Sequence, residues 1–225
     1  MRFNLSAGSV TDIAFSDEEG ALVFISDGEE IGNPEQPPIN NRVVVLKQEA
    51  SDTESFSVQG SFGSEGNGTG QFFIPHAVQT DACGRVWVAD RNNSRLQVFN
   101  TEGGHIATWD CFRPRCPQAL APFGDLVAGS PGRWLLGANK DLLVLPFSQD
   151  CTAPGTLGDC SIQWEQTIVF DQGPGQIHSV ASNPEASTVF TVVIEDPTDS
   201  LGILDKWHTY NENPIAAADH ESRGN

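Results

Sequence analysis

One pattern occurs four times along this chain and constrains its fold more than any other feature. Each copy has an apolar strand, a polar turn with Gly or Pro, and a second strand of β-branched and aromatic residues. The copies read "VTDIAFSDEEGALVFISDG" from Val10, "IPHAVQTDACGRVWVAD" from Ile74, "FGDLVAGSPGRWLLGANK" from Phe123 and "IHSVASNPEASTVFTVVIED" from Ile177. Such repetition predicts an architecture of repeated β-sheets.

The spacing of the copies indicates the kind of repeat. Aligned on Asp12, His76, Gly124 and His178, they lie 64, 48 and 54 residues apart, and the wide first interval holds the Pro-rich "EEIGNPEQPPIN". Further strands such as "RVVVL", "RLQVFN", "DLLVLPF" and "TIVFD" bring each unit to about four strands. A period of about 40–50 residues with four strands is typical of β-propeller blades. We therefore predict an all-β propeller over residues 1–207 and a flexible polar tail over 208–225.

The second unit carries a family resemblance. The segment "GSFGSEGNGTGQFFIPHAVQTDACGRVWVADRNNSRLQVFNTEGGHIATW" resembles a complete NHL repeat, with a glycine run before "QF", a "D-x-x-G-x-V-x-V-A-D" core and "N-x-R-L-Q-V-F". The other three units resemble it more weakly. The resemblance implies an NHL-type β-propeller with four visible blades, as part of a six-bladed propeller or as a truncated form. It also implies that Arg95 bonds to backbone or to Asp90 and stabilises the blade.

Among NHL proteins, "IPHAV" and "ADRNNSR" resemble peptidyl-α-hydroxyglycine α-amidating lyase (peptidylamidoglycolate lyase). That enzyme cleaves a peptidyl-hydroxyglycine to a peptide amide and glyoxylate. The resemblance implies a zinc-dependent carbon–nitrogen lyase in which His76 and His178 bind zinc in the central channel. It also implies that Arg91 holds the carboxylate of the substrate near the metal. Neutral imidazole suits Zn²⁺, and a guanidinium can bind a carboxylate through two hydrogen bonds.

The chain departs from the lyase pattern at several places. The family uses three zinc-binding histidines, and the first would lie upstream of Met1. Its catalytic tyrosine follows "SDG", where this chain has Glu29, while the single tyrosine is Tyr210 in the expected tail. Glu29 is therefore a candidate base or metal ligand, and Asp12 is a candidate third ligand. Because the chain is so acidic, calcium is a second candidate ion.

The charge balance restricts the partners. With 12 basic and 30 acidic residues, the formal net charge is −18, which opposes binding to nucleic acid. No apolar run approaches the length needed for membrane insertion. The alternative to the lyase is a noncatalytic NHL propeller that binds proteins on its faces, with acidic rims that steer cationic partners. The predicted partner is thus a peptide substrate or another protein.

The five cysteines give a further expectation. Cys111 and Cys116 are close in sequence, as are Cys151 and Cys160, and both pairs bracket loop-like segments in which a disulfide is plausible. Cys83 is then left over. Two such disulfides would indicate a secreted protein or one of the secretory lumen, and free thiols are the alternative. The N-terminus has no continuous apolar segment of the kind found in signal peptides.

Overall fold

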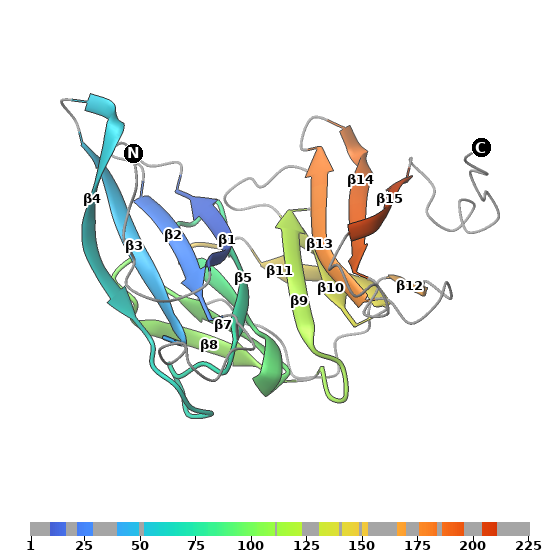
Figure 1. The fold of residues 1–225 in the computed structure, drawn as a ribbon, viewed down its shortest axis with the longest axis horizontal. Helices are drawn as coiled ribbons and strands as arrows, with labels where there is room; N and C mark the ends of the chain where they lie inside the picture. Colours follow the sequence, from blue (N-terminus) through green and yellow to red (C-terminus); the bar gives the residue numbers. More distant parts are fainter. Residues whose placement is uncertain are drawn as a thin grey trace.

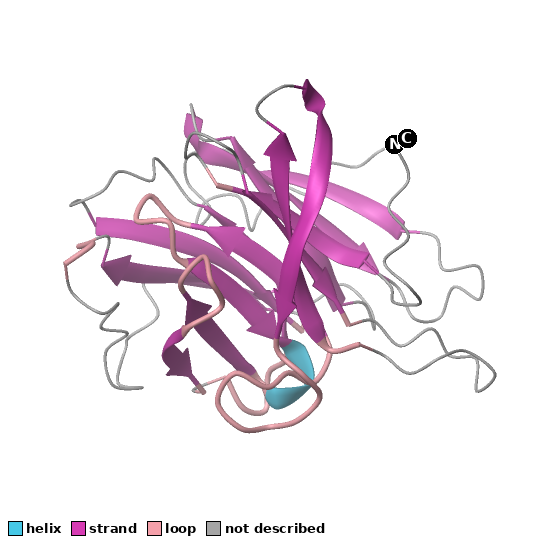
Figure 2. Cartoon of the chain, turned by 90° about the vertical axis from the view of Figure 1, so that its left-hand side faces the viewer, coloured by secondary structure: helices cyan, strands magenta, loops and turns pink. Residues whose placement is uncertain are grey.

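Strands make up most of the part of the chain that the structure describes. The computed structural model describes residues 10–16, 22–28, 40–49, 52–110, 112–122, 131–139, 141–148, 150–152, 166–169, 176–183, 186–195 and 204–210. In these ranges the one helix is the short 3-10 turn η1 (Arg91–Asn93), and it is far too short to cross a membrane (Figure 2). The prediction of an all-β fold is confirmed.

The strands form four antiparallel sheets, which are the four predicted blades. Blade 1 has β1 (Val10–Phe15), β2 (Leu22–Asp27), β3 (Arg42–Glu49) and β4 (Asp52–Phe62). Blade 2 has β5 (Pro75–Thr80), β6 (Val86–Asp90), β7 (Arg95–Phe99) and β8 (His105–Trp109). Blade 3 has β9 (Pro117–Pro122), β10 (Pro131–Ala138), β11 (Asp141–Ser148) and β12 (Gln166–Val169). Blade 4 has β13 (Gln176–Asn183), β14 (Ala186–Glu195) and β15 (Leu204–Tyr210). In each sheet, neighbouring strands are consecutive in the sequence.

Two predicted boundaries differ from the structure. Blade 3 begins with β9 (Pro117–Pro122), not at Phe123, and Gly124 lies outside the described residues. The strand was missed because "PQALAP" has no β-branched or aromatic residue and begins and ends with proline. At the other end, β15 includes His208 and Tyr210, which the sequence placed in the tail.

The first strand of each blade lies next to the first strand of the following blade. These inner strands, β1, β5, β9 and β13, contact one another in that order. In Figure 1, blades 1 and 2 form one half of the molecule and blades 3 and 4 form the other. The inner strands lie toward the middle, so residues far apart in the sequence meet there.

The core consists of apolar layers between consecutive blades. Strands buried on both faces have near-continuous apolar sequences, such as "LVFIS" in β2 and "LLVLPF" in β11. Phe24 of blade 1 packs in one cluster with Val86 and Val88 of blade 2. Blade 2 packs on blade 3 through a second cluster, and blade 3 packs on blade 4 through a third. We call the face of a blade that meets the next blade its outgoing face, and the face that meets the previous blade its incoming face.

The turn between β5 and β6 joins blade 2 to blade 3. Asp81 accepts hydrogen bonds from Arg85 Nε at 2.6 Å and from Trp87 Nε1 at 2.8 Å. Gly84 has φ of +70°, which a glycine adopts without strain, and it lets the chain reverse here. Arg85 Nη2 then donates to the carbonyl of Ser148 in blade 3. The turn is therefore both an internal element of blade 2 and a contact between blades.

The same turn carries a disulfide that the sequence did not predict. Cys83 is bonded to Cys151, just after β11, and Cys116 is a free thiol. The expected pairs Cys111–Cys116 and Cys151–Cys160 are therefore wrong. The physical reason is that the turn of one blade lies beside the strand end of the next, which brings together cysteines 68 residues apart. Proximity in the sequence was a poor guide to proximity between blades.

Arg95 has the structural role that the resemblance implied. Its Nε pairs with Asp90 Oδ2 at 2.6 Å. Its two Nη atoms donate to the carbonyls of Asn67, Gly68 and Gln71 at 2.7–2.9 Å. The side chain thus ties the glycine-rich loop before β5 to the end of β6.

Candidate functional site

Each inner strand has a β-bulge at its start. The pairing register with the second strand of the blade skips one residue, and the skipped residues are Thr11, His76, Gln118 and His178. A bulge changes the direction of a side chain without changing the rest of the sheet. These four residues are therefore the equivalent positions of the blades. The expected equivalence of Asp12 with His76 is wrong by one residue, and that of Gly124 is wrong because blade 3 begins earlier.

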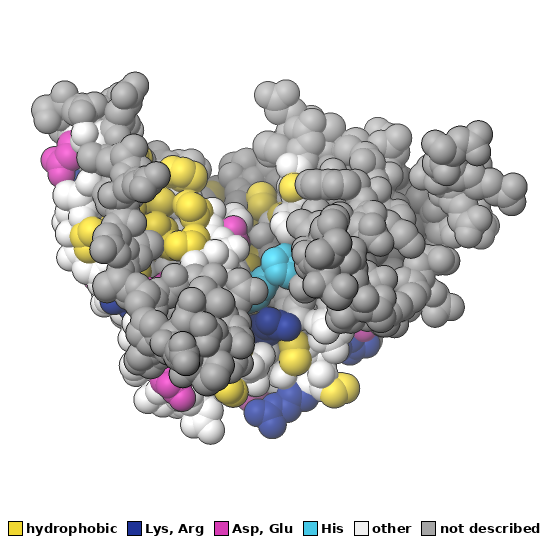
Figure 3. Space-filling view, viewed as in Figure 1, with side chains coloured by type: hydrophobic (Ala, Val, Ile, Leu, Met, Phe, Trp, Pro, Cys, Tyr) yellow, Lys and Arg dark blue, Asp and Glu magenta, His cyan; other side chains and the backbone are white. Residues whose placement is uncertain are grey.

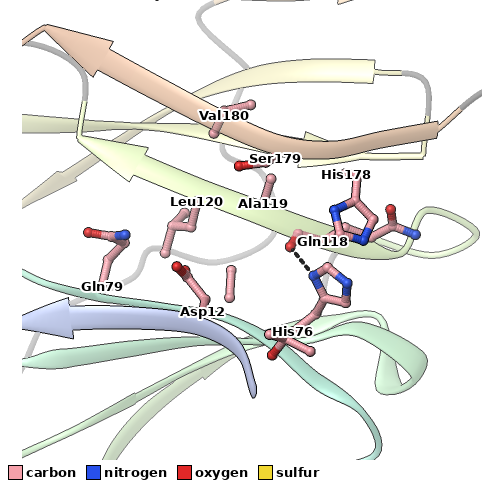
Figure 4. Close-up of a pocket in the computed structure, with 11 residues that line it drawn as sticks. Asp12, His76, Gln79, Gln118, Ala119, Leu120, His178, Ser179 and Val180 are labelled. Carbon is pink, nitrogen blue, oxygen red and sulfur yellow. Dashed lines mark hydrogen bonds between the residues drawn. The ribbon is translucent and has the colours of Figure 1, made fainter. Parts of the chain in front are cut away.

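The four bulge residues line one small cavity between the inner strands, which we call the axial cavity. Its volume is about 70 Å³. Asp12 and Gln79 also line it, and Figure 4 shows them at one end, with His76, His178 and Gln118 at the other.

His76 is a deeply buried polar side chain of the axial cavity, with 2% of its surface exposed, as is also the case for Gln118. Its Nδ1 lies 2.7 Å from the carbonyl oxygen of Gln118 (Figure 4). Because a carbonyl only accepts hydrogen bonds, Nδ1 carries the proton, and Nε2 has a free lone pair. This Nε2 has no hydrogen-bond partner among the described residues. Burial, together with repulsion from His178 and Arg91, lowers the pKa of His76 to about 4, so its ring is neutral at neutral pH.

His178 lies directly beside His76. The two ring centroids are 4.8 Å apart and the ring planes meet at 81°, edge to face. The two imidazoles that the sequence predicted to share one site are thus neighbours.

Arg91 lies near His76 and is held by an amide. It is the first residue of η1, and its backbone N–H donates to the carbonyl of Ile74. With the Gln118 amide turned so that its oxygen faces Arg91, Oε1 accepts from Arg91 Nε at 3.0 Å and from Nη2 at 3.1 Å. The Gln176 amide turns with it, because the two amide oxygens would otherwise lie 2.6 Å apart. Gln118 Nε2 then donates to the carbonyl of Ile177 at 3.1 Å. Arg91 makes no ion pair with a carboxylate in the described part of the chain, so its charge is available to a ligand.

A larger, open pocket lies on the other side of Gln118, and we call it the arginine pocket. Its volume is about 540 Å³, and its lining includes Arg91, Arg115, Asn139 and Gln176. Arg115 also pairs with Asp141. Figure 3 shows histidine side chains in the hollow between the two halves, with basic side chains next to them. Because Asp141 also lines the pocket, Arg91 supplies the positive charge that its own carboxylate does not neutralise, and this guanidinium with the nearby amides suits a carboxylate or another anion.

The structure brings together three of the four predicted site residues, His76, His178 and Arg91. Glu29 lies outside the described residues. Within the described ranges, no group of three or more His, Cys, Asp or Glu side chains is arranged to hold a metal ion. The sequence missed Gln118, although the shared pattern in "PHAV" and "PQAL" was a signal for it. It also missed Arg115, which had no such signal.

Asp12 gives a pH-dependent prediction. Burial raises its pKa from 3.8 to about 6, although N–H groups of Val78 and Ile13 bond to its carboxylate. Between these pH values the folded state binds more protons than the unfolded state, so the contribution of Asp12 to stability falls as pH rises. We expect Asp12→Asn to gain about 2.5 kcal/mol relative to the unsubstituted protein between pH 4 and pH 7. Urea unfolding at several pH values measures this difference, with the exposed Glu102→Gln as control. A difference that does not change with pH contradicts the prediction.

Comparisons with known proteins support the repeat assignment. Residues 74–99 match the family model of the NHL repeat. NHL repeat-containing protein 3 of Mus musculus is 40% identical over 128 residues, which cover 55% of this chain and 33% of that protein. The Homo sapiens protein of the same name is 33% identical over 149 residues, covering 64% of this chain and 37% of that protein. Protein lin-41 of Caenorhabditis elegans is 45% identical over 47 residues, covering 21% of this chain and 4% of that protein.

The chain therefore contains an NHL repeat and is homologous to NHL repeat-containing protein 3. It spans about a third of the length of these two relatives. None of the three relatives carries the name of the amidating lyase, so the resemblance to that enzyme stays a prediction.

Proposed function

We propose that this chain is a noncatalytic NHL-repeat scaffold, and that its arginine pocket binds an acidic segment of a partner protein. The observation that carries the proposal is the position of Arg91. The amide of Gln118 holds its guanidinium, which lines the same pocket as Arg115. Among the described residues, this guanidinium has no carboxylate partner. The rest of the chain is strongly acidic, with a net charge of −18. An anionic segment is therefore repelled elsewhere and attracted here, which fixes how the partner docks.

The first test removes the charge of Arg91. We expect Arg91→Ala to weaken the binding of a fluorescein-labelled hexaglutamate peptide by about 10- to 100-fold, the loss of a charge-assisted hydrogen-bonded pair. Fluorescence anisotropy measures the affinity. Arg113→Ala is the matched control, because Arg113 is exposed and does not line the pocket. Equal affinities for Arg91→Ala and the unsubstituted protein, or equal losses for both variants, would overturn the proposal.

The second candidate is the amidating-lyase-like metalloprotein. One observation favours it: the neutral His76 has a free Nε2 and lies beside His178 and Arg91. A catalytic zinc site takes three protein ligands and keeps a fourth position open. The described residues supply two imidazoles and no third ligand, so they do not complete such a site. We therefore rank the lyase second and derive no reaction step through a metal.

Metal analysis separates the two candidates. Two histidines alone hold zinc weakly. We therefore expect purified protein that is loaded with zinc and then dialysed to retain well under one zinc per chain. The His76→Ala variant should retain the same amount of zinc. The exposed His105→Ala is the control. One zinc per chain that is lost in His76→Ala and His178→Ala but kept in His105→Ala would favour the lyase. Turnover of a peptidyl-α-hydroxyglycine by the same protein would establish it.

We also propose that the protein works in an oxidising compartment. The Cys83–Cys151 disulfide supports this, because such bonds persist mainly in secreted proteins and in the secretory lumen. Alkylation of free thiols in freshly lysed cells tests it. Cys83 and Cys151 should both be protected, and alkylation of both would contradict the proposal.

A further inference from the structure

Two acceptor sequences for N-linked glycans lie at one end of blade 2. Such a glycan is attached to the asparagine of Asn-x-Ser or Asn-x-Thr, in which x is not proline, and the hydroxyl two positions on takes part in the transfer. Asn67-Gly68-Thr69 lies in the glycine-rich loop before β5, and Asn92-Asn93-Ser94 covers the end of η1 and the residue after it. A third sequence, Asn4-Leu5-Ser6, lies outside the described residues.

The first acceptor sequence is accessible, and the loop around it is held by backbone groups. Asn67 and Thr69 are both exposed. The carbonyl of Asn67 accepts a hydrogen bond from Arg95 Nη1 at 2.8 Å, and the N–H of Gly68 donates to Gln71 Oε1 at 2.9 Å. These bonds do not use the side chains of Asn67 and Thr69. A glycan on the Asn67 amide therefore leaves the hydrogen bonds of the loop intact.

The second acceptor sequence is built into the fold. Asn92 is exposed, but Ser94 is only 8% exposed and has a φ of +56°. The N–H of Ser94 donates to the carbonyl of Arg91, and the N–H of Asn92 donates to the carbonyl of Phe73. A transferase therefore cannot reach the Ser94 hydroxyl in the folded chain, whereas the Thr69 hydroxyl stays accessible. Transfer to Asn92 would have to precede the folding of η1.

The two asparagines also differ in their relation to the arginine pocket. Asn92 lines this pocket together with Arg91, so a glycan on Asn92 would stand in the way of a peptide. Asn67 is not one of the lining residues. Its loop lies beside η1, because Asn93 Nδ2 donates to the carbonyl of Gly66 at 2.8 Å. A glycan on Asn67 thus lies at the same end of blade 2 and leaves the pocket open.

We propose that Asn67 carries an N-linked glycan and that Asn92 does not, so that the glycan lies near the arginine pocket without covering it. The inference rests on the proposed oxidising compartment, because N-linked glycans are added in the secretory lumen, where the Cys83–Cys151 disulfide also persists. It is consistent with the proposed binding of an acidic segment, which needs Arg91 to be accessible.

The native protein provides the first test. In the freshly lysed cells used for thiol alkylation, peptide-N-glycosidase F should lower the apparent mass of the protein on a denaturing gel. Mass spectrometry before this treatment should find a glycan on the peptide that contains Asn67 and none on the peptide that contains Asn92. An unmodified Asn67 with Cys83 and Cys151 protected overturns this inference but not the proposed compartment. Alkylation of both cysteines overturns the two together.

Substitutions in the acceptor sequences assign the glycan. The full chain is secreted from cultured animal cells behind a cleavable signal sequence, with Asn4→Gln as the background. Thr69→Ala should abolish the shift that the glycosidase causes, while Thr69→Ser, which keeps the hydroxyl, should retain it. Asn92→Gln is the matched control and should leave the shift unchanged. A shift that survives Thr69→Ala, or one that is lost in Asn92→Gln, overturns the proposal.

Peptide binding tests whether the pocket stays open. The secreted protein should bind fluorescein-labelled hexaglutamate with an affinity within about twofold of that measured after glycosidase treatment. An increase of about tenfold or more on treatment would mean that a glycan covers the pocket, which overturns the proposal. Failure of both forms to bind would overturn the proposed function, while the glycan on Asn67 would stand on the mass measurements alone.

Discussion

Removing the Cys83–Cys151 disulfide should lower the free energy of unfolding by about 4 kcal/mol. The bond closes a segment of 68 residues, and a cross-link of this length restricts the unfolded chain by about that amount. It also joins the turn of blade 2 to the end of β11 in blade 3, where Arg85 already bonds to Ser148. Chemical denaturation of Cys83→Ala/Cys151→Ala against the oxidised protein measures the loss.

The free thiol provides the control for this prediction. Cys116 is half-buried, and among the described residues its Sγ makes only a long contact of 3.9 Å with Ser94 Oγ. Cys116→Ala should therefore change the free energy of unfolding far less than the double substitution. Equal denaturation midpoints for the oxidised protein and the double variant would show that the bond does not restrict the unfolded chain as expected.

Arg95→Ala should destabilise the protein by about 3–5 kcal/mol, the usual cost of leaving one member of a buried ion pair alone. The Asp90 carboxylate is completely buried and would lose its cationic partner. The carbonyls of Asn67, Gly68 and Gln71 would lose their donors in the same step. Thermal and urea unfolding measure the change.

Two substitutions make the Arg95 experiment specific. Arg113→Ala removes an equal charge from the surface and should change stability by less than about 0.5 kcal/mol. Arg95→Lys keeps the charge but lacks the planar fork, so its stability should lie between those of the alanine variant and the unsubstituted protein. If Arg95→Ala is no less stable than Arg113→Ala, the arginine does not hold the glycine-rich loop to β6.

The sequence predicted those parts of the fold that local patterns determine. In blade 2, the alternation of Val86 and Val88 with Trp87, the turn from Asp81 to Gly84 and the pair of Asp90 with Arg95 are all read from neighbouring residues. The resemblance to the amidating lyase, and not a local pattern, singled out His76, His178 and Arg91 as site residues.

The sequence failed where the answer depends on contacts between blades. The partner of Cys83 is in the next blade, and no spacing along the chain indicates it. Thr11, and not Asp12, is equivalent to His76, because a bulge shifts the register by one residue. Gln118 and Arg115 were missed because their importance depends on their neighbours in space. The amide of Gln118 holds Arg91, and the guanidinium of Arg115 lines the same pocket as Arg91.

The bulge at the start of every inner strand separates two requirements that a repeat protein usually has to meet with the same residues. Side chains in register must fit the neighbouring blades, so their size and polarity are fixed by packing. The bulged residue has no cross-strand partner and faces the axial cavity, so a hydroxyl, an amide and two imidazoles occupy this position in successive blades. Substitutions there can change the chemistry of the axis one blade at a time, while the stack of sheets that supports it remains the same.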